Sequence, residues 1–288
     1  MLSFAAALAV YLLAFAFLVI FQRELFYSRA THGSWQDLSA QAKEMGLEPW
    51  LDRKGAPLGF KKLSPHSKYR CVVFHGNALD ALHRIAFVHG LEQFGGEWDV
   101  YLFEYPGYGW RDGKASQTNL VCDALFAWQQ LQDADSGKPT FIFGESLGAA
   151  VACQLAEEIA KGDDRYVDAN GAYAWRPYSL QIAGMFLITP FNHLGEAAQN
   201  HFKIFPVQPF MFDTYRSDEA IQHYHGPIAF MLAESDRIIP ARIGRKLYDA
   251  YRGPKKLWVI PRAGHNTIPK APKEPWWREV VEFLIEQQ

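Results

Sequence analysis

Short apolar runs alternate with longer segments of helical periodicity along most of this chain. The runs are rich in β-branched and aromatic side chains and end in Gly, Pro or polar residues, which predicts buried strands. Strands are predicted near 47–51, 57–63, 72–74, 100–103, 141–143, 185–188, 228–232 and 257–260, and helices over 35–45, 81–94, 116–131, 147–160, 241–251 and 276–286. Strands that alternate with helices form βαβ units, so the pattern predicts an α/β protein with a mostly parallel, eight-stranded sheet flanked by helices.

The N-terminal segment has a different pattern. Leu2–Phe21 contains no charged residue and has the length that spans a bilayer. No basic residue follows Met1, and no small-residue cleavage site is evident, so we predict an uncleaved single-pass transmembrane anchor rather than a signal peptide. Arg23 and Arg29 follow the run, and only the α-amino group precedes it. This asymmetry predicts that the rest of the chain is cytoplasmic, with a periplasmic or lumenal location as the alternative.

The pattern divides the chain into an anchor (2–21), a connector (22–46) and an α/β domain (47–288). Within that domain, residues 191–224 lie between two predicted strands and are rich in aromatic, Pro and His residues. Because the segment is too long for a simple crossover, we predict a lid, with a packed crossover helix as the alternative. Residues 162–183 form a possible insertion.

Composition and charge exclude several classes of function. The formal net charge is −2 at pH 7, so no nucleic-acid partner is implied. The three cysteines are far apart in the sequence, which favours buried thiols over disulfides or a thiolate metal site. Neither a dinucleotide fingerprint nor a metal-ligand motif is evident, so no cofactor and no metal are predicted.

A predicted strand–turn–helix junction with one serine at its apex carries the strongest chemical signal. Residues 140–150 read TFIFGESLGAA, with Ser146 between Gly144 and Gly148. Glycines at these positions let strand and helix approach closely, and the tight turn exposes the serine hydroxyl at the top of the sheet. The alternative is a turn that needs its glycines and holds an inert serine. Because a free hydroxyl is a poor nucleophile, the motif requires a histidine and an acid.

Two later strand ends supply an acid and a histidine. Asp236 follows the predicted strand at 228–232, and His265 follows the one at 257–260. In parallel sheets of this kind the ligand binds at the carboxyl ends of the strands, where both residues lie. We predict that Asp236 orients His265, which takes the proton from Ser146. Glu234 is a rival acid, ranked lower because the turn after Asp236 fits the loop position better.

An earlier turn predicts an oxyanion hole. The apolar run at 71–74 ends in His75-Gly76-Asn77, and a turn of this kind can supply one backbone N–H to a developing negative charge. The residue after the nucleophile supplies the other. The predicted donors are therefore Asn77 and Leu147, and His75 is predicted to be structural.

Five motifs together resemble a known group of proteins. They are HGNA (75–78), EYPGYG (104–109), GESLG (144–148), AESDRIIP (233–240) and AGHN (263–266). From about residue 21 onward, the chain resembles membrane-anchored serine α/β-hydrolases related to acylglycerol and lysophospholipid lipases and palmitoyl-protein thioesterases. The resemblance implies an α/β-hydrolase fold and the same roles for the residues named above. Glu104, where Asp is more usual, and Pro106, where Arg is common, depart from the pattern.

These observations predict a serine hydrolase that cleaves carboxylic ester or thioester bonds through an acyl-enzyme. A serine peptidase with the same site and a non-catalytic membrane-anchored scaffold are the alternatives. The predicted lid is rich in aromatic residues, of which Phe191 and Phe210 are the predicted substrate contacts. Because an anchor raises the effective concentration of membrane-bound substrates, we expect a membrane-proximal acyl lipid or acylated protein.

Overall fold

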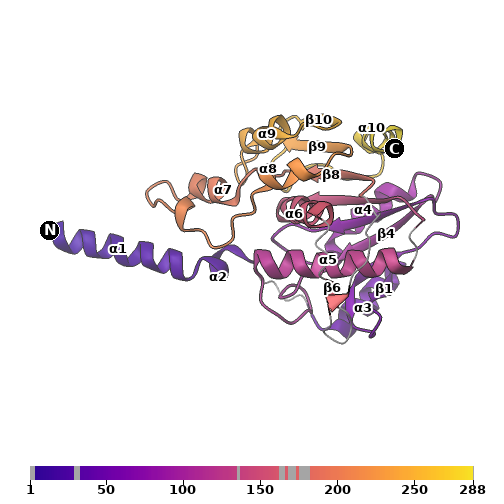
Figure 1. Ribbon diagram of the computed structural model, residues 1–288, viewed down its shortest axis with the longest axis horizontal. Coiled ribbons are helices and arrows are strands. Elements are labelled where there is room, and N and C mark those ends of the chain that lie inside the picture. The colour runs from indigo at the N-terminus through magenta and orange to yellow at the C-terminus, as the bar shows by residue number, and fades with distance from the viewer. Residues whose placement is uncertain are drawn as a thin grey trace.

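The computed structural model describes residues 4–28, 33–134, 137–161, 166–167, 173–174 and 182–287. An eight-stranded sheet lies between two layers of helices (Figure 1). Its strands are β1 (Glu48–Leu51), β2 (Pro57–Lys62), β3 (Tyr69–Phe74), β4 (Trp98–Phe103), β5 (Thr140–Glu145), β8 (Gly184–Ile188), β9 (Ile228–Ala233) and β10 (Lys255–Ile260). They are ordered β1-β2-β4-β3-β5-β8-β9-β10, and neighbouring strands are parallel except that β2 is antiparallel to both β1 and β4. The predicted α/β architecture is confirmed.

Helices cover both faces of this sheet. The helical segments are α1 (Phe4–Ile20), α2 (Gln22–Phe26), α3 (Trp35–Glu44), η1 (Ala81–Arg84), α4 (Ile85–Glu92), α5 (Gln117–Ala134), α6 (Leu147–Lys161), α7 (Leu194–His201), η2 (Gln208–Phe210), α8 (Ser217–Ala220), η3 (Ile221–His223), α9 (Ala241–Ala250) and α10 (Trp276–Glu286). Helices α5, α6, α8 and α9 pack on one face, and α3, α4 and α10 pack on the other. The short strands β6 (Tyr166–Val167) and β7 (Tyr173–Ala174) pair separately.

The central strands are apolar at successive positions because both of their faces are buried. In β5, Ile142 belongs to the core beneath α5 and α6, whereas Phe141 and Phe143 belong to the core beneath α4 and α10. Successive side chains of a strand point to opposite faces, so a strand between two helical layers needs apolar residues throughout. This burial explains why continuous apolar runs predicted these strands.

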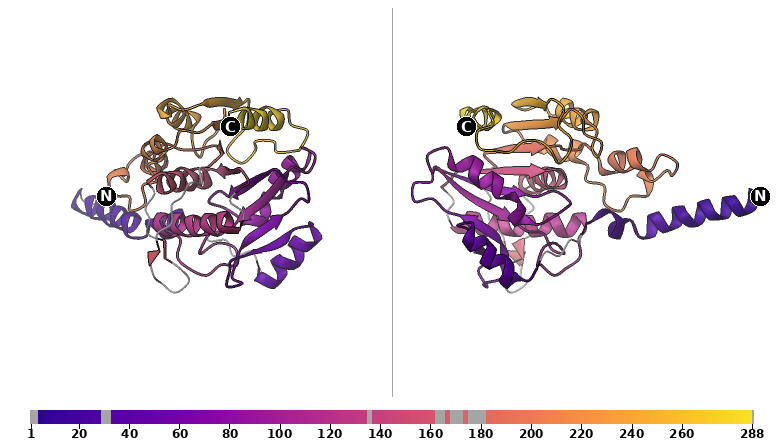
Figure 2. Two further views of the ribbon diagram at one scale, coloured as in Figure 1. Left: turned by 45° about the vertical axis from the view of Figure 1, so that its right-hand side comes forward. Right: turned by 180° about the vertical axis from the view of Figure 1, so that it is seen from behind.

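Helix α1 projects from the body of the protein, as Figures 1 and 2 show. It has 17 residues, none of them buried. Among the described residues, no helix is long and apolar enough to cross a membrane, so the predicted transmembrane helix is not supported. Arg29 and most of the possible insertion at 162–183 lie outside the described residues.

Candidate active site

The junction between β5 and α6 holds Ser146 in a backbone conformation that few side chains adopt. Ser146 has φ +55°, and its N–H donates to the Ile188 carbonyl at 2.9 Å. A Cβ on Gly148 would lie 2.1 Å from the Phe74 carbonyl oxygen, and one on Gly144 would lie 2.5 Å from the Gly148 carbonyl oxygen. Both glycines are therefore required because backbone atoms approach too closely for a side chain.

This close approach makes Gly148→Ala destabilising. Alanine in a helix normally gains about 1 kcal/mol over glycine, but here its methyl group would collide with the backbone of β3. We expect a net loss of about 2 kcal/mol or more in the free energy of unfolding, measured by urea denaturation. The control is Gly264→Ala, because a Cβ there would meet its nearest atom at an ordinary 3.5 Å. Equal stability of the two variants would contradict the prediction.

Ser146, His265 and Asp236 form one hydrogen-bonded chain. His265 Nε2 lies 2.9 Å from Ser146 Oγ, and His265 Nδ1 lies 2.7 Å from Asp236 Oδ2. A carboxylate accepts, so Nδ1–H donates to Asp236 and Nε2 is left to accept from the serine hydroxyl. Asp236 and His265 are both buried. The structure therefore brings together three residues from three strand ends that are far apart in the sequence.

The two rival carboxylates differ in their contacts. Asp236 Oδ1 accepts the backbone N–H groups of Ile238 and Ile239, each at 2.8 Å, while its other oxygen faces His265. Glu234 is exposed, and its Oε2 accepts the Arg262 N–H at 2.8 Å. Of the two, Asp236 is the one that is hydrogen-bonded to His265 and held in a fixed orientation.

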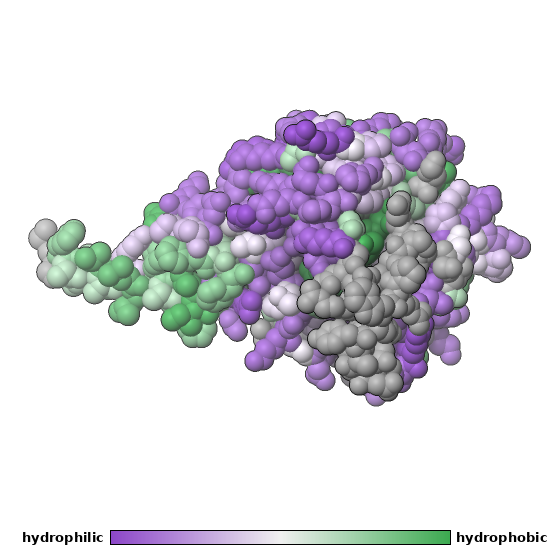
Figure 3. Space-filling model, viewed as in Figure 1, coloured by the Kyte–Doolittle hydropathy of each residue, from purple (hydrophilic) through white to green (hydrophobic). Residues whose placement is uncertain are grey.

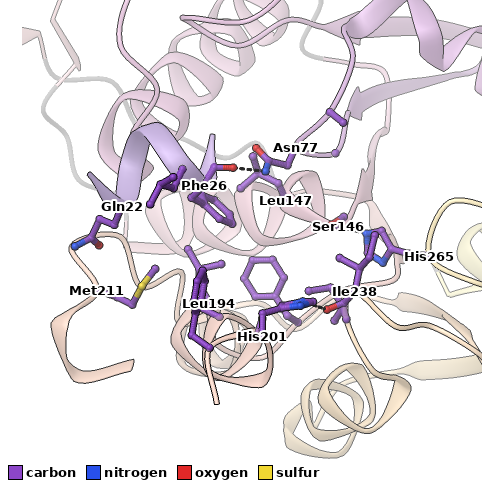
Figure 4. Close-up of a pocket in the computed structure, with 18 of the residues that line it drawn as sticks. Gln22, Phe26, Asn77, Ser146, Leu147, Leu194, His201, Met211, Ile238 and His265 are labelled. Atoms are coloured by element: carbon purple, nitrogen blue, oxygen red, sulfur yellow. Dashed lines mark hydrogen bonds between the residues drawn. The ribbon is translucent and has the colours of Figure 1, made fainter. Parts of the chain in front are cut away.

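The two predicted oxyanion donors line the same pocket as Ser146 (Figure 4). Leu147 is the first residue of α6, and Asn77 lies in the turn after β3. The Asn77 side chain accepts from the Tyr108 hydroxyl at 2.6 Å and donates to the Phe26 carbonyl. These bonds hold the turn in place beside the serine, and the backbone N–H groups remain the predicted donors.

His75 lies beneath this turn and is completely buried. Its Nε2 is 2.8 Å from Glu104 Oε1, and its Nδ1 is 2.7 Å from the Gly76 carbonyl. The other oxygen of Glu104 accepts the Ala81 N–H at 3.0 Å. Glu104, which departs from the usual motif, thus ties the turn after β3 to the start of η1, as a supporting rather than a reacting group.

A cluster of three charged side chains lies beside the serine, and sequence reasoning missed it. Glu145 Oε1 accepts from Lys270 Nζ at 2.8 Å, and Glu145 Oε2 lies 2.7 Å from Arg84 Nε as an ion pair without hydrogen-bond geometry. Burial by itself would raise the pKa of Glu145, but the charges of Arg84 and Lys270 outweigh it and lower that pKa. Glu145 is therefore an anion held between two cations.

Ser146 and His265 line a pocket of about 700 Å³. This volume is in the range of small-molecule sites. Apolar side chains from α1, α2, α7 and η2 line much of it, including Leu18, Phe26, Leu194 and Phe210. In Figure 4 the labelled apolar residues Phe26, Leu194 and Met211 lie to one side of Ser146 and His265. The predicted substrate contacts Phe191 and Phe210 both line this pocket.

The N-terminal segment is hydrogen-bonded to the predicted lid. Gln22 donates to the Phe210 carbonyl at 3.1 Å and accepts the Phe212 N–H at 2.7 Å. The Arg23 guanidinium makes two hydrogen bonds of 2.9 Å to Asp213. These pairs are separated by about 190 positions, and no local pattern could have revealed them. The predicted connector is thus part of the pocket wall.

The residues described contain no group of three or more His, Cys, Asp or Glu side chains arranged to hold a metal ion. The arrangement around Ser146 instead offers a hydroxyl, a base, an orienting carboxylate and an apolar pocket. Such a combination suits nucleophilic attack on an acyl carbonyl.

Comparisons with known proteins agree with this architecture. A model of the alpha/beta hydrolase family matches residues 71–275. The uncharacterized protein Rv2307c of Mycobacterium tuberculosis is 34% identical over 197 residues, which cover 68% of this chain. The lysophosphatidylserine lipase ABHD12 of Danio rerio is 28% identical over 268 residues, which cover 84% of this chain. The chain spans 62% of the length of each of these relatives.

Solved structures show the same fold. The esterase Pf2001 of Pyrococcus furiosus superposes with a TM-score of 0.63, covering 89% of this chain and 95% of the esterase. Its sequence is 16% identical, so this likeness concerns the fold alone.

Proposed function

This chain belongs to the alpha/beta hydrolase family and is a hydrolase, and from that premise we propose that it cleaves carboxylic ester or thioester bonds through an acyl-enzyme on Ser146. The observation that carries the proposal is the hydrogen-bonded chain of Ser146, His265 and Asp236 at the wall of an apolar pocket. A hydroxyl becomes an effective nucleophile when an oriented base takes its proton.

The proposed reaction has two halves. Ser146 Oγ attacks the acyl carbonyl while His265 Nε2 takes the hydroxyl proton. The resulting oxyanion accepts hydrogen bonds from the backbone N–H groups of Asn77 and Leu147. His265 then protonates the departing alcohol or thiol, which leaves an acyl-serine. In the second half, His265 takes a proton from water, the resulting hydroxide equivalent attacks the acyl carbon, and the acid leaves as Ser146 regains its proton. Asp236 stabilises the imidazolium in both halves.

We propose that the apolar part of the pocket takes the acyl chain. Phe210 of η2 lines the pocket and makes an edge-to-face contact with Phe15 of α1, with ring centroids 5.1 Å apart. Each methylene transferred from water to such a wall contributes about 0.8 kcal/mol, so a longer acyl chain binds more tightly until the pocket is full. The substrate class this supports is an acyl ester or thioester with at least a medium-length chain.

The surface around the pocket supports a lipid or a lipid-modified protein as the source of that chain. Figure 3 shows apolar residues gathered along α1 and the adjoining segment. Several of their large apolar side chains are exposed, among them Leu13, Phe17, Ile204 and Phe212. Exposed apolar surface of this extent is typical of interaction sites. Whether the domain is cytoplasmic stays a prediction.

A series of esters of rising chain length tests the acyl pocket. We expect kcat/KM to rise from acetyl through medium chains, by up to about fourfold for each added methylene. Phe210→Ala should flatten that rise because it removes part of the wall. The control is Phe212→Ala, since Phe212 is close by and exposed but does not line the pocket. A maximum at acetyl or propionyl, or equal flattening by both variants, would contradict this assignment. Peptide and aminoacyl substrates run in parallel test the peptidase alternative.

A further inference from the structure

The charged part of the pocket wall has an excess of positive charge. Among the Asp, Glu, Lys and Arg side chains that the structure describes, three line the pocket: Arg84, Glu145 and Lys270. Two cations face one carboxylate, so this wall carries a net charge of +1. Charged groups in a partly buried wall interact more strongly than in water, because solvent screens them less. The wall therefore attracts a further negative charge.

The two cations retain access to the pocket. The exposed fractions of the Arg84 and Lys270 side chains are 14% and 18%, whereas that of Glu145 is 9%. The closest contact of Arg84 with Glu145 is through Nε, and its Nη2 donates to the Ala78 carbonyl at a long 3.5 Å. A guanidinium has five N–H donors and an ammonium has three, so Glu145 does not exhaust the donors of either cation.

These cations are also close to the proposed reaction centre. A Cβ built on Gly76 would lie 3.6 Å from both Arg84 Nη2 and Ser146 Cβ, so both residues lie close to Gly76. Lys270 lies in the loop that follows His265. The charged groups thus come from the end of η1, from the end of β5 and from the loop between β10 and α10, whereas α1, α2 and α7 supply apolar side chains to the pocket.

We propose that Arg84 and Lys270 bind an anionic group, a phosphate or a carboxylate, on the alcohol or thiol portion of the substrate. The substrate class is then an acyl ester or thioester with an apolar chain and an anionic head group, an inference that rests on the proposed function. Arginine suits both anions because its fork of donors matches their oxygens, and charge-assisted hydrogen bonds are stronger than neutral ones. Glu145 neutralises one of the two cations and keeps the pair in place.

Three esters of the same acyl chain test the proposal on the full chain: monooctanoylglycerol, its phosphate monoester, and the octanoyl ester of glyceric acid. The measured quantity is the ratio of kcat/KM for each anionic ester to that for the neutral one. We expect wild type to prefer at least one anionic ester by about tenfold. Whether the phosphate or the carboxylate ester is preferred identifies the anion. If wild type prefers the neutral ester to both anionic esters, that result alone overturns the proposal, and no variant needs to be measured.

Variants then separate anion binding from a structural role of the cluster. Arg84→Gln and Lys270→Gln should each lower the ratio about tenfold, because they remove a cation from the wall. Glu145→Gln is the matched control, since it disturbs the same ion pairs but removes the negative charge, and its ratio should stay the same or rise. Equal proportional losses on neutral and anionic esters in all three variants would mean that the cluster only supports the fold.

Folding of each variant is checked by its melting temperature. If Arg84→Gln does not fold, Arg84→Lys, which keeps the charge, should retain the anionic preference, and Lys270→Gln should still lose it. Retained preference in Lys270→Gln would then contradict the proposal. No turnover of any of the three esters by wild type contradicts the proposed ester hydrolysis and this inference with it. Turnover of the neutral ester without an anionic preference contradicts this inference alone.

Discussion

Ser146→Ala is expected to lower kcat for ester hydrolysis by about 10⁴-fold or more. Ser146 Oγ is the atom that faces His265 Nε2 at 2.9 Å, and alanine leaves the base without a hydroxyl to activate. Any residual rate comes from water attacking an ester that the pocket and the oxyanion donors still bind. The same substitution should abolish covalent labelling by a fluorophosphonate probe, which reacts with activated serines.

A second serine provides the control for this experiment. Ser116 is buried and its Oγ accepts the Asn119 N–H at 3.2 Å, but it does not line the pocket. Ser116→Ala should keep both the labelling and most of the activity. Labelling that persists in Ser146→Ala would show that another residue is the nucleophile. Loss of activity in both variants would indicate that the substitutions had destabilised the protein and had not specifically removed the nucleophile.

Asp236→Asn is expected to lower kcat roughly 10⁴-fold while the protein stays folded. The amide nearly matches the carboxylate in size, so the two backbone N–H bonds from Ile238 and Ile239 can persist. Its NH₂ group, however, donates to His265 Nδ1 and places the ring proton on Nε2. A protonated Nε2 cannot accept the proton of Ser146, and the positive charge on the imidazolium loses its counter-charge.

Glu234→Gln is the matched control because it makes the same chemical change two residues away. Its carboxylate accepts the Arg262 N–H, and the amide oxygen of glutamine can do the same. We expect a loss of less than about threefold in kcat, since an exposed charge is largely screened by solvent. A larger loss in Glu234→Gln than in Asp236→Asn would assign the acid to Glu234.

The strands and helices around the site were predictable because their signals are local. The run at 141–143 is apolar throughout since β5 is buried on both faces, and the small residues after Ser146 reflect the close packing of α6 on the sheet. Gly148 is required because the backbone of Phe74 and His75, which is distant in the sequence, lies too close for a side chain, but the motif around Ser146 by itself already indicates a glycine at this position. Each of these signals is contained in a short stretch of the sequence and can be recognised there without knowledge of the fold.

The role of the N-terminal segment was not predictable from hydropathy. An uncharged stretch of 20 residues predicted a spanning helix, whereas α1 ends at Ile20 and α2 begins at Gln22. Hydropathy counts side chains without regard to where they pack. It therefore could not show that this helix lines a pocket through Leu18 and contacts Phe205 through Tyr11.

The sequence by itself determined the α/β fold, the strained turn at Ser146 and the order of candidate residues at the strand ends. The spacing of nearby residues in the sequence indicates each of these features. Only the tertiary structure decided that Asp236 and not Glu234 contacts His265, that Gln22 bonds to the predicted lid, and that Glu145 lies between two cations. Hydrogen bonds and ion pairs act over a few ångströms of space. These residues are between 29 and 190 positions apart in the sequence, and they reach that distance only when the chain has folded.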